Sequence, residues 1–343
     1  MDSSLVLVAN AKDGTISAFE LTEDALKPLG RSAVGAPGLP LAVDANRDLV
    51  FAGTSNPASV TTLRLDRASG ALTPLGRYPL HGNPTYLKLS SDGGLLLNAS
   101  YHQGLGEVLR VGDNGTLSAV GDPIAYRNLH SVQLSPDDAF CYFVSLGDDL
   151  VAQYALSADG KLTPLDPPTV GAPAGCGPRH IVLDSSGTSA YVITEYSGQV
   201  LHYRRDPVTG ALEQASLAIC IPTDRGLSHS RFGAQPREED LIWGADLHLD
   251  GQERLLYCSE RTRGTITAVQ VAEQTGELGA ATAHSDVVAQ PRGFRVLPNG
   301  DLLVASEIDR VVARYRPDED GALAELDRQQ VGLGANWIEV VPR

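Results

Sequence analysis

Short apolar segments separated by polar turns recur along the whole chain in one repeated pattern. Each copy begins near Pro or Gly and continues with a short apolar strand and a turn that contains Asp or Ser. A second strand and a third strand follow, and the third strand ends at a charged residue. The clearest copies, 178–212 and 291–323, both end in Gly-Ala-Leu. Because strands alternate with tight turns and no segment has the period of a long amphipathic helix, the pattern predicts an all-β protein.

The copies follow one another at regular steps, mostly of 45 to 49 residues. They begin near Leu39, Pro84, Leu129, Pro178, Trp243, Pro291 and Asn336. The step from Pro178 to Trp243 is longer, and we expect the polar stretch 224–240 within it to be an inserted loop. Turn-forming sequences typical of hairpins lie at 12–14, 91–93, 159–160, 186–187 and 299–300.

Repeats of this length built from four short strands are typical of propeller blades, with a solenoid as the alternative. The two ends of the chain are complementary, because residues 5–9 have the place of a second strand and residues 337–341 that of a lone first strand. Joining them completes one blade and removes two exposed sheet edges. We therefore predict a single domain over residues 1–343, a seven-bladed β-propeller whose ring is closed by a C-terminal strand in the first blade.

Polar residues gather at one predicted end of the propeller channel. First strands line the channel and second strands run antiparallel to them, so the starts of the former and the ends of the latter share one face. Strand starts supply Asn83, Asn128, His130, Arg179, His180, Trp243, Arg292 and Asn336, and strand ends supply Asn10, Tyr101, His102, Asp148, Glu195, Glu260, Arg261 and Glu307. Each residue alone also fits a structural ion pair, but their convergence predicts a binding site.

The composition narrows the choice of partners. Lys and Arg number 27 and Asp and Glu 42, which gives a formal net charge of −15 and argues against binding to nucleic acid or to an anionic membrane. The start has no signal-peptide pattern, and no apolar run reaches the roughly 18 residues of a membrane span. Cys141, Cys176, Cys220 and Cys258 form no Cys-x-x-Cys pair, so we expect reduced thiols and a cytoplasmic location. We also expect a monomer or a weak homodimer.

The segment 177–180, Gly-Pro-Arg-His, followed by Glu195, resembles the bacterial 6-phosphogluconolactonase family of seven-bladed propellers. That family is related to the fungal 3-carboxy-cis,cis-muconate lactonizing enzyme. Supporting segments at 129–136, 243–248, 259–262, 291–294 and 331–337 extend the similarity over essentially the whole chain, whereas 101–104 matches less well. The resemblance implies a sugar-lactone hydrolase or, less often, a lactone-forming cycloisomerase. It also implies that His130, Arg179, Glu195 and Arg261 act in the reaction.

Lactone hydrolysis needs a group that polarises the carbonyl and a group that activates water. Arg179 and Arg261 can donate charge-assisted hydrogen bonds to an oxyanion or to a substrate anion. Glu195 or His130 can take the proton from water, and Glu195 is our leading assignment although arginines around it would weaken it as a base. We expect further substrate contacts from His180, Asn128, Asp246, His248, Arg292, Glu307 and Trp337.

An anionic lactone is the expected substrate: 6-phosphogluconolactone, an aldarolactone or a muconolactone. Arg127 and Arg263 could hold a phosphate, although both also fit solvated loops. Sugar lactones rank first because the rim offers groups that bind hydroxyls, namely Asn83, Asn128 and Asn336.

We expect no cofactor and no metal. Glu195, Asp246, His248 and Glu307 could in principle hold a divalent ion, but the arginines nearby would repel it. Ser131 beside His130 lacks the elbow that exposes a serine nucleophile. A non-catalytic interaction scaffold is the alternative to an enzyme, although an ionic rim suits a small ligand better than a partner protein.

Overall fold

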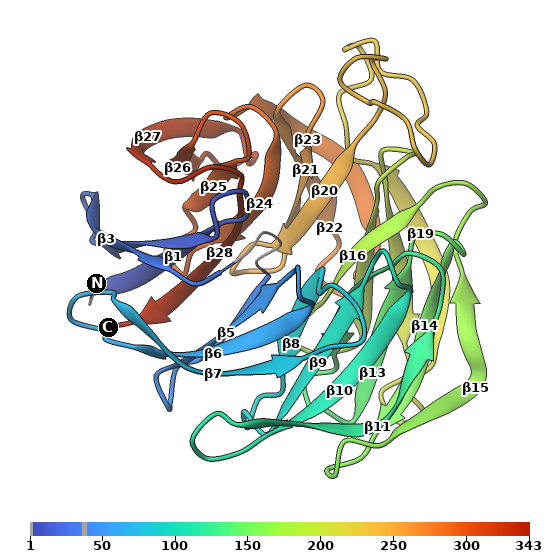
Figure 1. Cartoon of the computed structure of the whole chain (residues 1–343). Helices are drawn as coiled ribbons and strands as arrows, with labels where there is room; N and C mark the ends of the chain where they lie inside the picture. The colour runs from blue at the N-terminus through green and yellow to red at the C-terminus, as the bar shows by residue number, and fades with distance from the viewer. Residues whose placement is uncertain (1–2, 36–39) are drawn as a thin grey trace.

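The computed structural model describes residues 3–35 and 40–343, and within these ranges every regular element is a β-strand. The strands form seven antiparallel sheets of four strands each, arranged around one central axis (Figure 1). Each sheet is one blade. The predicted all-β, seven-bladed β-propeller is therefore confirmed.

Within each blade the strands follow one another outward from the channel. Blade 1 contains β28 (Ala335–Pro342), β1 (Ser4–Asn10), β2 (Thr15–Leu21) and β3 (Leu26–Ala33), and blade 2 contains β4 (Leu41–Asp44), β5 (Leu49–Thr54), β6 (Ser59–Leu65) and β7 (Leu72–Pro79). Blade 3 contains β8 (Tyr86–Leu89), β9 (Leu95–Ser100), β10 (Leu105–Val111) and β11 (Leu117–Ala125), and blade 4 contains β12 (Leu129–Leu134), β13 (Phe140–Ser145), β14 (Leu150–Leu156) and β15 (Leu162–Gly171). Blade 5 contains β16 (Pro178–Leu183), β17 (Ser189–Thr194), β18 (Gln199–Arg205) and β19 (Leu212–Ile219), and blade 6 contains β20 (Gly244–Leu249), β21 (Leu255–Glu260), β22 (Thr265–Val271) and β23 (Leu278–Asp286). Blade 7 contains β24 (Pro291–Val296), β25 (Leu302–Ser306), β26 (Val311–Pro317) and β27 (Leu323–Gln330).

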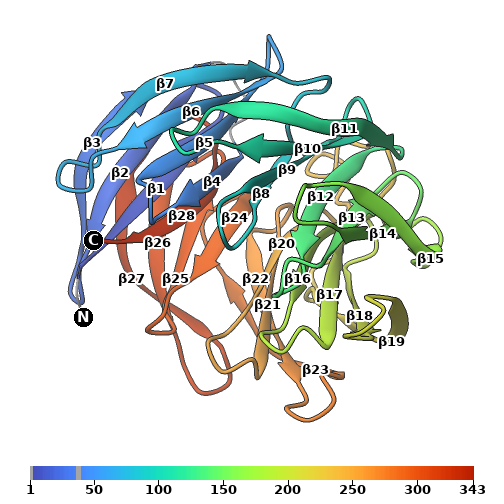
Figure 2. The ribbon, with the colours of Figure 1, turned by 90° about the horizontal axis from the view of Figure 1, so that it is seen from below.

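Strands from the two ends of the chain close the ring in blade 1 (Figure 2). β28 pairs antiparallel with β1, with Ala9 opposite Trp337 and Leu5 opposite Val341. The innermost strands contact one another in order around the channel, from β28 through β4, β8, β12, β16, β20 and β24 back to β28. The predicted closure by the C-terminal strand is confirmed.

The hydrophobic core lies between neighbouring blades. Second strands such as β5 and β17 are buried along their whole length, whereas fourth strands such as β7 are mostly exposed. Each cluster of buried apolar side chains combines two adjacent blades: Val6 and Val8 of blade 1 pack with Leu303 and Ala305 of blade 7. Because burying one such side chain contributes about 1.5–3 kcal/mol, an open ring would lose a whole layer of this packing.

The inserted loop predicted over 224–240 is confirmed. The segment between β19 and β20 contains no strand, and Ser228 and Leu241 form a single parallel bridge near its base. In Figure 1 this segment projects beyond the blades. The predicted start of blade 2 near Leu39 lies outside the described residues, and β4 begins at Leu41.

In five blades the first strand has one extra residue at the channel mouth. Between β16 and β17, Pro178 lies opposite Thr194 and His180 opposite Ile193, which leaves Arg179 as the extra residue. The same shift in register makes His130 the extra residue in blade 4, Arg292 in blade 7 and Asn336 in blade 1. In blade 6 the extra residue lies between Gly244 and Leu247. A β-bulge re-aims the side chains around it, so successive residues of one strand can face the same cavity.

Two glycines allow the first strands of blades 6 and 7 to approach the neighbouring blade beside these bulges. A Cβ atom on Gly244 would lie 2.2 Å from the carbonyl oxygen of Thr194, and one on Gly293 would lie 2.4 Å from that of Asn336. A larger residue at either position would force the blades apart at the channel mouth.

Candidate active site

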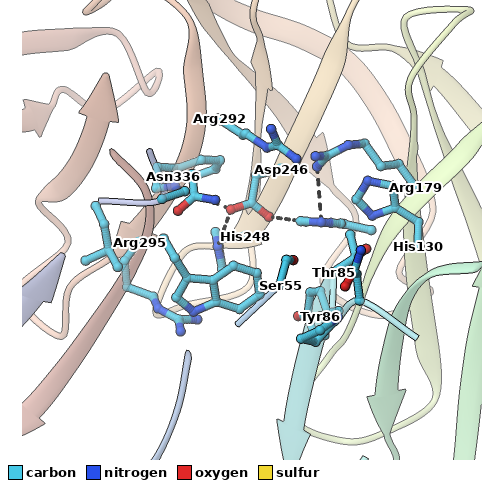
Figure 3. A pocket seen from close by; sticks show the side chains of 18 of the residues that line it. Ser55, Thr85, Tyr86, His130, Arg179, Asp246, His248, Arg292, Arg295 and Asn336 are labelled. Carbon is cyan, nitrogen blue, oxygen red and sulfur yellow. Dashed lines mark hydrogen bonds and ion pairs between the residues drawn. The ribbon is translucent and has the colours of Figure 1, made fainter. Parts of the chain in front are cut away.

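A pocket of about 190 Å³ opens at the channel mouth where the bulges lie (Figure 3). Side chains from distant parts of the sequence meet there because the blades are arranged in a ring. Of the predicted site residues, the pocket is lined by His130, Arg179, His180, Asp246, His248, Arg292 and Trp337, and by Asn83, His102 and Asn336 of the predicted rim.

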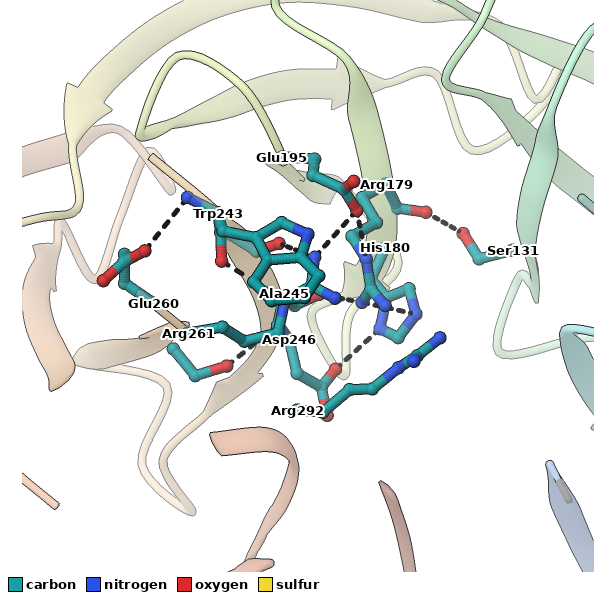
Figure 4. A network of polar contacts seen from close by, with 12 residues as sticks. Ser131, Arg179, His180, Glu195, Trp243, Ala245, Asp246, Glu260, Arg261 and Arg292 are labelled. Carbon is teal, nitrogen blue, oxygen red and sulfur yellow. Dashed lines mark hydrogen bonds and ion pairs between the residues drawn. The ribbon is translucent and has the colours of Figure 1, made fainter. Parts of the chain in front are cut away.

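Arg179 is buried, and its guanidinium is held in one orientation (Figure 4). Nε donates to Oε2 of Glu195 at 2.9 Å, and Nη1 donates to the carbonyl oxygen of Ala245 and to Nε2 of His180, the latter at 3.1 Å. Nη2 has no hydrogen-bond partner within the ranges that the structure describes, so it remains available to a ligand. Burial and the neighbouring Arg261 lower the pKa of Arg179 to about 9, which leaves it cationic at neutral pH.

Glu195 is not among the residues that line the pocket and lies behind Arg179. Its Oε2 atom accepts hydrogen bonds from Arg179 Nε and from Arg261 Nη2, each at 2.9 Å. Burial raises the pKa of Glu195, but Arg261 and Arg179 outweigh burial, and the net pKa lies below its ordinary value. The carboxylate is therefore ionised and shared between two arginines.

Arg261 reaches Glu195 from blade 6 and is also absent from the pocket wall. Its Cζ lies 3.8 Å from the centre of the Trp243 ring, and Nη2 donates to the carbonyl oxygen of Gly244 at 3.0 Å. The aromatic face and the carbonyl fix the guanidinium so that it supports Glu195.

His130 is buried and forms no hydrogen bond within the described ranges; its Nδ1 atom is buried without a partner. Burial and the charge of Arg179 hold the pKa of His130 well below its ordinary value, so the imidazole is neutral at neutral pH. A neutral imidazole keeps one lone pair that can accept a proton. The adjacent Ser131 is buried and donates its hydroxyl to the carbonyl oxygen of Arg179 at 2.7 Å, so it has a structural role.

Asp246 connects two histidines of the pocket. Its Oδ1 atom lies 2.8 Å from Nδ1 of His180, and Oδ2 lies 3.3 Å from Nε2 of His248. Burial would raise the pKa of Asp246, but His248 and His180 hold it well below its ordinary value. Figure 3 shows the carboxylate beside His248, and Figure 4 shows it beside His180.

Arg292 adds a third arginine at the mouth. Its Nη1 donates to Glu307 Oε1 at 3.1 Å, and Glu307 also accepts from the side-chain amide of Gln290. Arg179, Arg261 and Arg292 therefore form ion pairs with two carboxylates, Glu195 and Glu307. Asp246 is a third ionised carboxylate of the site, so the charges of the three arginines are balanced.

Several predicted rim residues do not reach the pocket. Asn128 donates to the carbonyl oxygen of Tyr101 at 3.4 Å, outside the pocket wall. Arg127 pairs with Asp148, and Arg263 pairs with Asp240. Arg127 and Arg263 therefore form no basic cluster at the pocket, and the alternative prediction, that both are surface loop residues, agrees with the structure.

Other rim residues stabilise turns. Glu260 accepts hydrogen bonds from the backbone N–H groups of Trp243, Thr262 and Arg263. Asn10 donates to Ser17 and accepts from the backbone of Gly332. The topological rule that selected the rim therefore cannot separate binding residues from residues that cap a turn.

Four polar residues that line the pocket were not predicted from the sequence: Ser55, Thr85, Tyr86 and Arg295. Ser55 directly follows β5, so the rule of second-strand ends could have found it. Tyr86 and Arg295 lie within β8 and β24, below the rim, where that rule does not apply.

No group of three His, Cys, Asp or Glu side chains in residues 3–35 and 40–343 is arranged to hold a metal ion. Of the four residues weighed as ligands, Glu195 and Glu307 are paired with arginines, and Asp246 bridges His180 and His248. The carboxylates of these residues are therefore occupied by arginine and histidine side chains.

The fold and the site define a seven-bladed propeller with a ligand-sized pocket, lined by arginines and histidines, at one end of its channel. Residues 5–340 match the family described as "Lactonase, 7-bladed beta-propeller", and the chain belongs to this family. The protein is therefore a lactone-hydrolysing enzyme, a carboxylic-ester hydrolase. This confirms the resemblance and the enzyme class predicted from the sequence.

Two relatives have closely matching lengths. The chain is 30% identical to the 6-phosphogluconolactonase of Cronobacter sakazakii over 311 residues, covering 90% of this chain and 89% of that protein. It is also 30% identical to the 6-phosphogluconolactonase of Pectobacterium carotovorum, covering 90% of each. Among solved structures, the periplasmic gluconolactonase of Pseudomonas aeruginosa has the same fold, with a TM-score of 0.87 at 24% identity over 99% of both chains. Within the described ranges there is no helix long and apolar enough to cross a membrane.

Proposed function

We propose that this protein hydrolyses an anionic sugar lactone to the open acid, with 6-phosphogluconolactone as the first substrate to test. The observation that carries the proposal is Nη2 of Arg179, a pocket residue, because this atom has no hydrogen-bond partner within the described ranges. A guanidinium N–H group can donate a charge-assisted hydrogen bond to a carbonyl oxygen or to a substrate anion. The names of the two bacterial relatives agree with this substrate.

In the proposed reaction, Nη2 of Arg179 donates to the lactone carbonyl oxygen. Water loses a proton to the catalytic base and its oxygen bonds to the carbonyl carbon, and the negative charge that develops on the carbonyl oxygen is stabilised by Arg179. The C–O bond of the ring then breaks, and the ring oxygen takes up a proton as it leaves. The products are the carboxylic acid, which ionises, and the freed hydroxyl group.

The geometry favours His130 over Glu195 as the base. His130 lines the pocket and has a free lone pair, whereas Oε2 of Glu195 already accepts from two arginines. The cations that hold the pKa of His130 low are partly neutralised when an anionic substrate binds, which would raise that pKa towards a useful value. Glu195 then orients Arg179 and Arg261. Direct proton transfer to Glu195 is the alternative.

The rest of the pocket supports a hydroxylated anion. Oδ1 of Asn336 is buried and has no hydrogen-bond partner among residues 3–35 and 40–343, so it can accept from a substrate hydroxyl. Arg292 is one-third exposed at its side chain and can meet a carboxylate or a phosphate at the mouth. His248 and Trp337 line the same cavity and add contacts to the ring of the lactone, whereas Glu307 acts on the substrate through Arg292.

A screen of 6-phosphogluconolactone, an aldarolactone and a muconolactone, with products identified by NMR, tests the proposal. We expect faster ring opening of a sugar lactone than in buffer alone. Formation of a muconolactone from the open muconate, with no sugar-lactone hydrolysis, would instead assign the cycloisomerase reaction.

We also propose a cytoplasmic location and a monomer or weak homodimer. All four cysteines, which lie in the described ranges, are buried free thiols, as expected in a reducing compartment. Cell fractionation tests the location, and light scattering after gel filtration tests the assembly. A disulfide-bonded protein recovered from the periplasm would contradict the first proposal.

A further inference from the structure

We propose that Asp246 and His180 act as positioning residues: Asp246 fixes one tautomer of His180, and His180 then holds the guanidinium of Arg179 in its catalytic orientation. This inference rests on the proposed role of Arg179 and changes the expectation that His180 and Asp246 bind substrate directly.

The contact between Arg179 and His180 defines the tautomer. Nη1 of Arg179 lies 3.1 Å from Nε2 of His180. A guanidinium can only donate hydrogen bonds, so Nε2 must carry the lone pair and accept. The single proton of the neutral ring is then on Nδ1.

The second ring nitrogen has a partner that matches this assignment. Nδ1 of His180 lies 2.8 Å from Oδ1 of Asp246, and an ionised carboxylate can only accept. Nε2 of His180 therefore faces a group that can only donate, and Nδ1 faces a group that can only accept. Burial and Arg179 lower the pKa of His180 to about 4, so the ring is neutral near pH 7 and keeps the lone pair that Arg179 needs.

Asp246 is itself held in place. Its Oδ2 atom accepts from the backbone N–H of Phe294 at 3.3 Å and contacts Nε2 of His248 at 3.3 Å. These contacts come from blades 6 and 7, whereas His180 belongs to blade 5. The carboxylate thus ties three blades together behind Arg179.

The ring plane of His180 is also restricted. The centre of its ring lies 5.2 Å from that of Tyr86 and 5.1 Å from that of His130, both in edge-on contact. The bulge at Arg179 brings this residue and His180 to the same cavity although they are adjacent in sequence. Figure 4 shows the chain of contacts from Asp246 through His180 to Arg179.

Two substitutions separate the two functions of the imidazole. In His180→Gln the amide oxygen can replace Nε2 as the acceptor for Arg179, whereas in His180→Asn the amide can replace only Nδ1, which faces Asp246. We expect H180N to lower kcat/KM for the lactone by about 10–100-fold, as is typical when an orienting partner is lost, and H180Q to retain at least about tenfold more activity than H180N.

A double variant tests whether His180 acts through Arg179. If it does, adding H180N to Arg179→Ala should cause little further loss of kcat/KM, because the positioned group is already absent. His202→Asn is the matched control: His202 is a buried histidine of blade 5 that contacts Ser189 and Ser216, outside the pocket. Melting temperatures of all variants separate catalytic effects from unfolding.

A measurement on the unmodified protein keeps the inference testable if H180N does not fold. Long-range ¹H–¹⁵N NMR correlations of the histidine rings should show His180 protonated at Nδ1 and unprotonated at Nε2. A proton at Nε2, or equal activities of H180Q and H180N, would overturn the inference. If Arg179→Ala has full activity, the proposed function of Arg179 fails whatever tautomer is found, so the two failures can be told apart.

Discussion

Oε2 of Glu195 lies 2.9 Å from Nε of Arg179, which is 16 residues earlier in the chain and on the neighbouring strand of the same blade. The bulge at Arg179 and the end of β17 at Thr194 bring the two side chains together. The same oxygen also accepts from Arg261. One oxygen of the carboxylate thus accepts from two cations, and this pairing determines what substitutions at Glu195 should do.

The first prediction compares the two candidate bases. With His130 as the base, His130→Asn should lower kcat by roughly two to four orders of magnitude with little change in KM, because proton transfer contributes about that much. Glu195→Gln should raise KM more than it lowers kcat and should lower the melting temperature, because it removes the partner of two buried arginines. Steady-state kinetics with both variants decide between them. A large loss of kcat in Glu195→Gln with normal kcat in His130→Asn would make Glu195 the base.

The second prediction concerns the arginines. Arg292→Ala should raise KM for an anionic lactone by about 10–100-fold, as expected for a lost charge-assisted hydrogen bond, and should affect glucono-δ-lactone much less. Arg179→Ala should lower kcat for both lactones, because Arg179 is proposed to stabilise the oxyanion that either lactone forms. Arg127→Ala is the control, because Arg127 is exposed and pairs with Asp148 away from the pocket. Equal losses on the charged and the neutral lactone in Arg292→Ala would show that Arg292 does not select the anion. A loss in Arg179→Ala that is confined to the charged lactone would show that Arg179 holds the anion and does not polarise the carbonyl.

The third prediction is a loss of stability in mild acid. The folded pKa of His180 is about 4, below the ordinary value of 6.5, so between these values the unfolded chain binds more protons and the free energy of unfolding falls as the pH falls. His180 alone accounts for about 3 kcal/mol of this loss, since one pKa unit corresponds to about 1.4 kcal/mol. The titratable and charged groups that face His180 are Arg179, Asp246, His130, Tyr86 and His248.

Urea unfolding from pH 7 to pH 4.5 measures this effect. His180→Gln should flatten the pH dependence, because its amide does not titrate. His202→Asn is a less suitable control here, since the pKa of His202 is also lowered by burial. An unchanged slope in His180→Gln would show that other groups, such as His130, produce the loss.

The fourth prediction concerns ring closure. Deleting residues 337–343 removes most of β28, exposes one edge of β1 and should unfold or aggregate the protein. Val341→Asp is a milder test, because Val341 is buried in the layer between blades 1 and 2, and an unpaired charge there should cost several kcal/mol. Val208→Asp, at an exposed turn, is the matched control and should leave the melting temperature unchanged. A deletion variant that melts like the intact chain would contradict the need for closure.

The sequence by itself determined the fold, because strand periodicity and turn chemistry are local properties. The spacing of the repeats and the complementary ends predicted seven blades and their closure by residues 337–341, and the structure confirms both. Topology also placed His130, Arg179 and Arg292 at one channel mouth. This placement required only that the starts of first strands and the ends of second strands lie on the same face of the propeller.

Only the tertiary structure decided which rim residues form the pocket and how they interact. Glu195 and Glu260 occupy the same kind of position in sequence, yet Glu195 pairs with two arginines and Glu260 accepts backbone N–H groups of a turn. The direction of Arg179 depends on a bulge and on His180 and Asp246, which lie in different blades. These contacts join residues far apart in the chain, and both hydrogen bonding and electrostatic shifts of pKa vary steeply with distance, so local sequence patterns do not specify them.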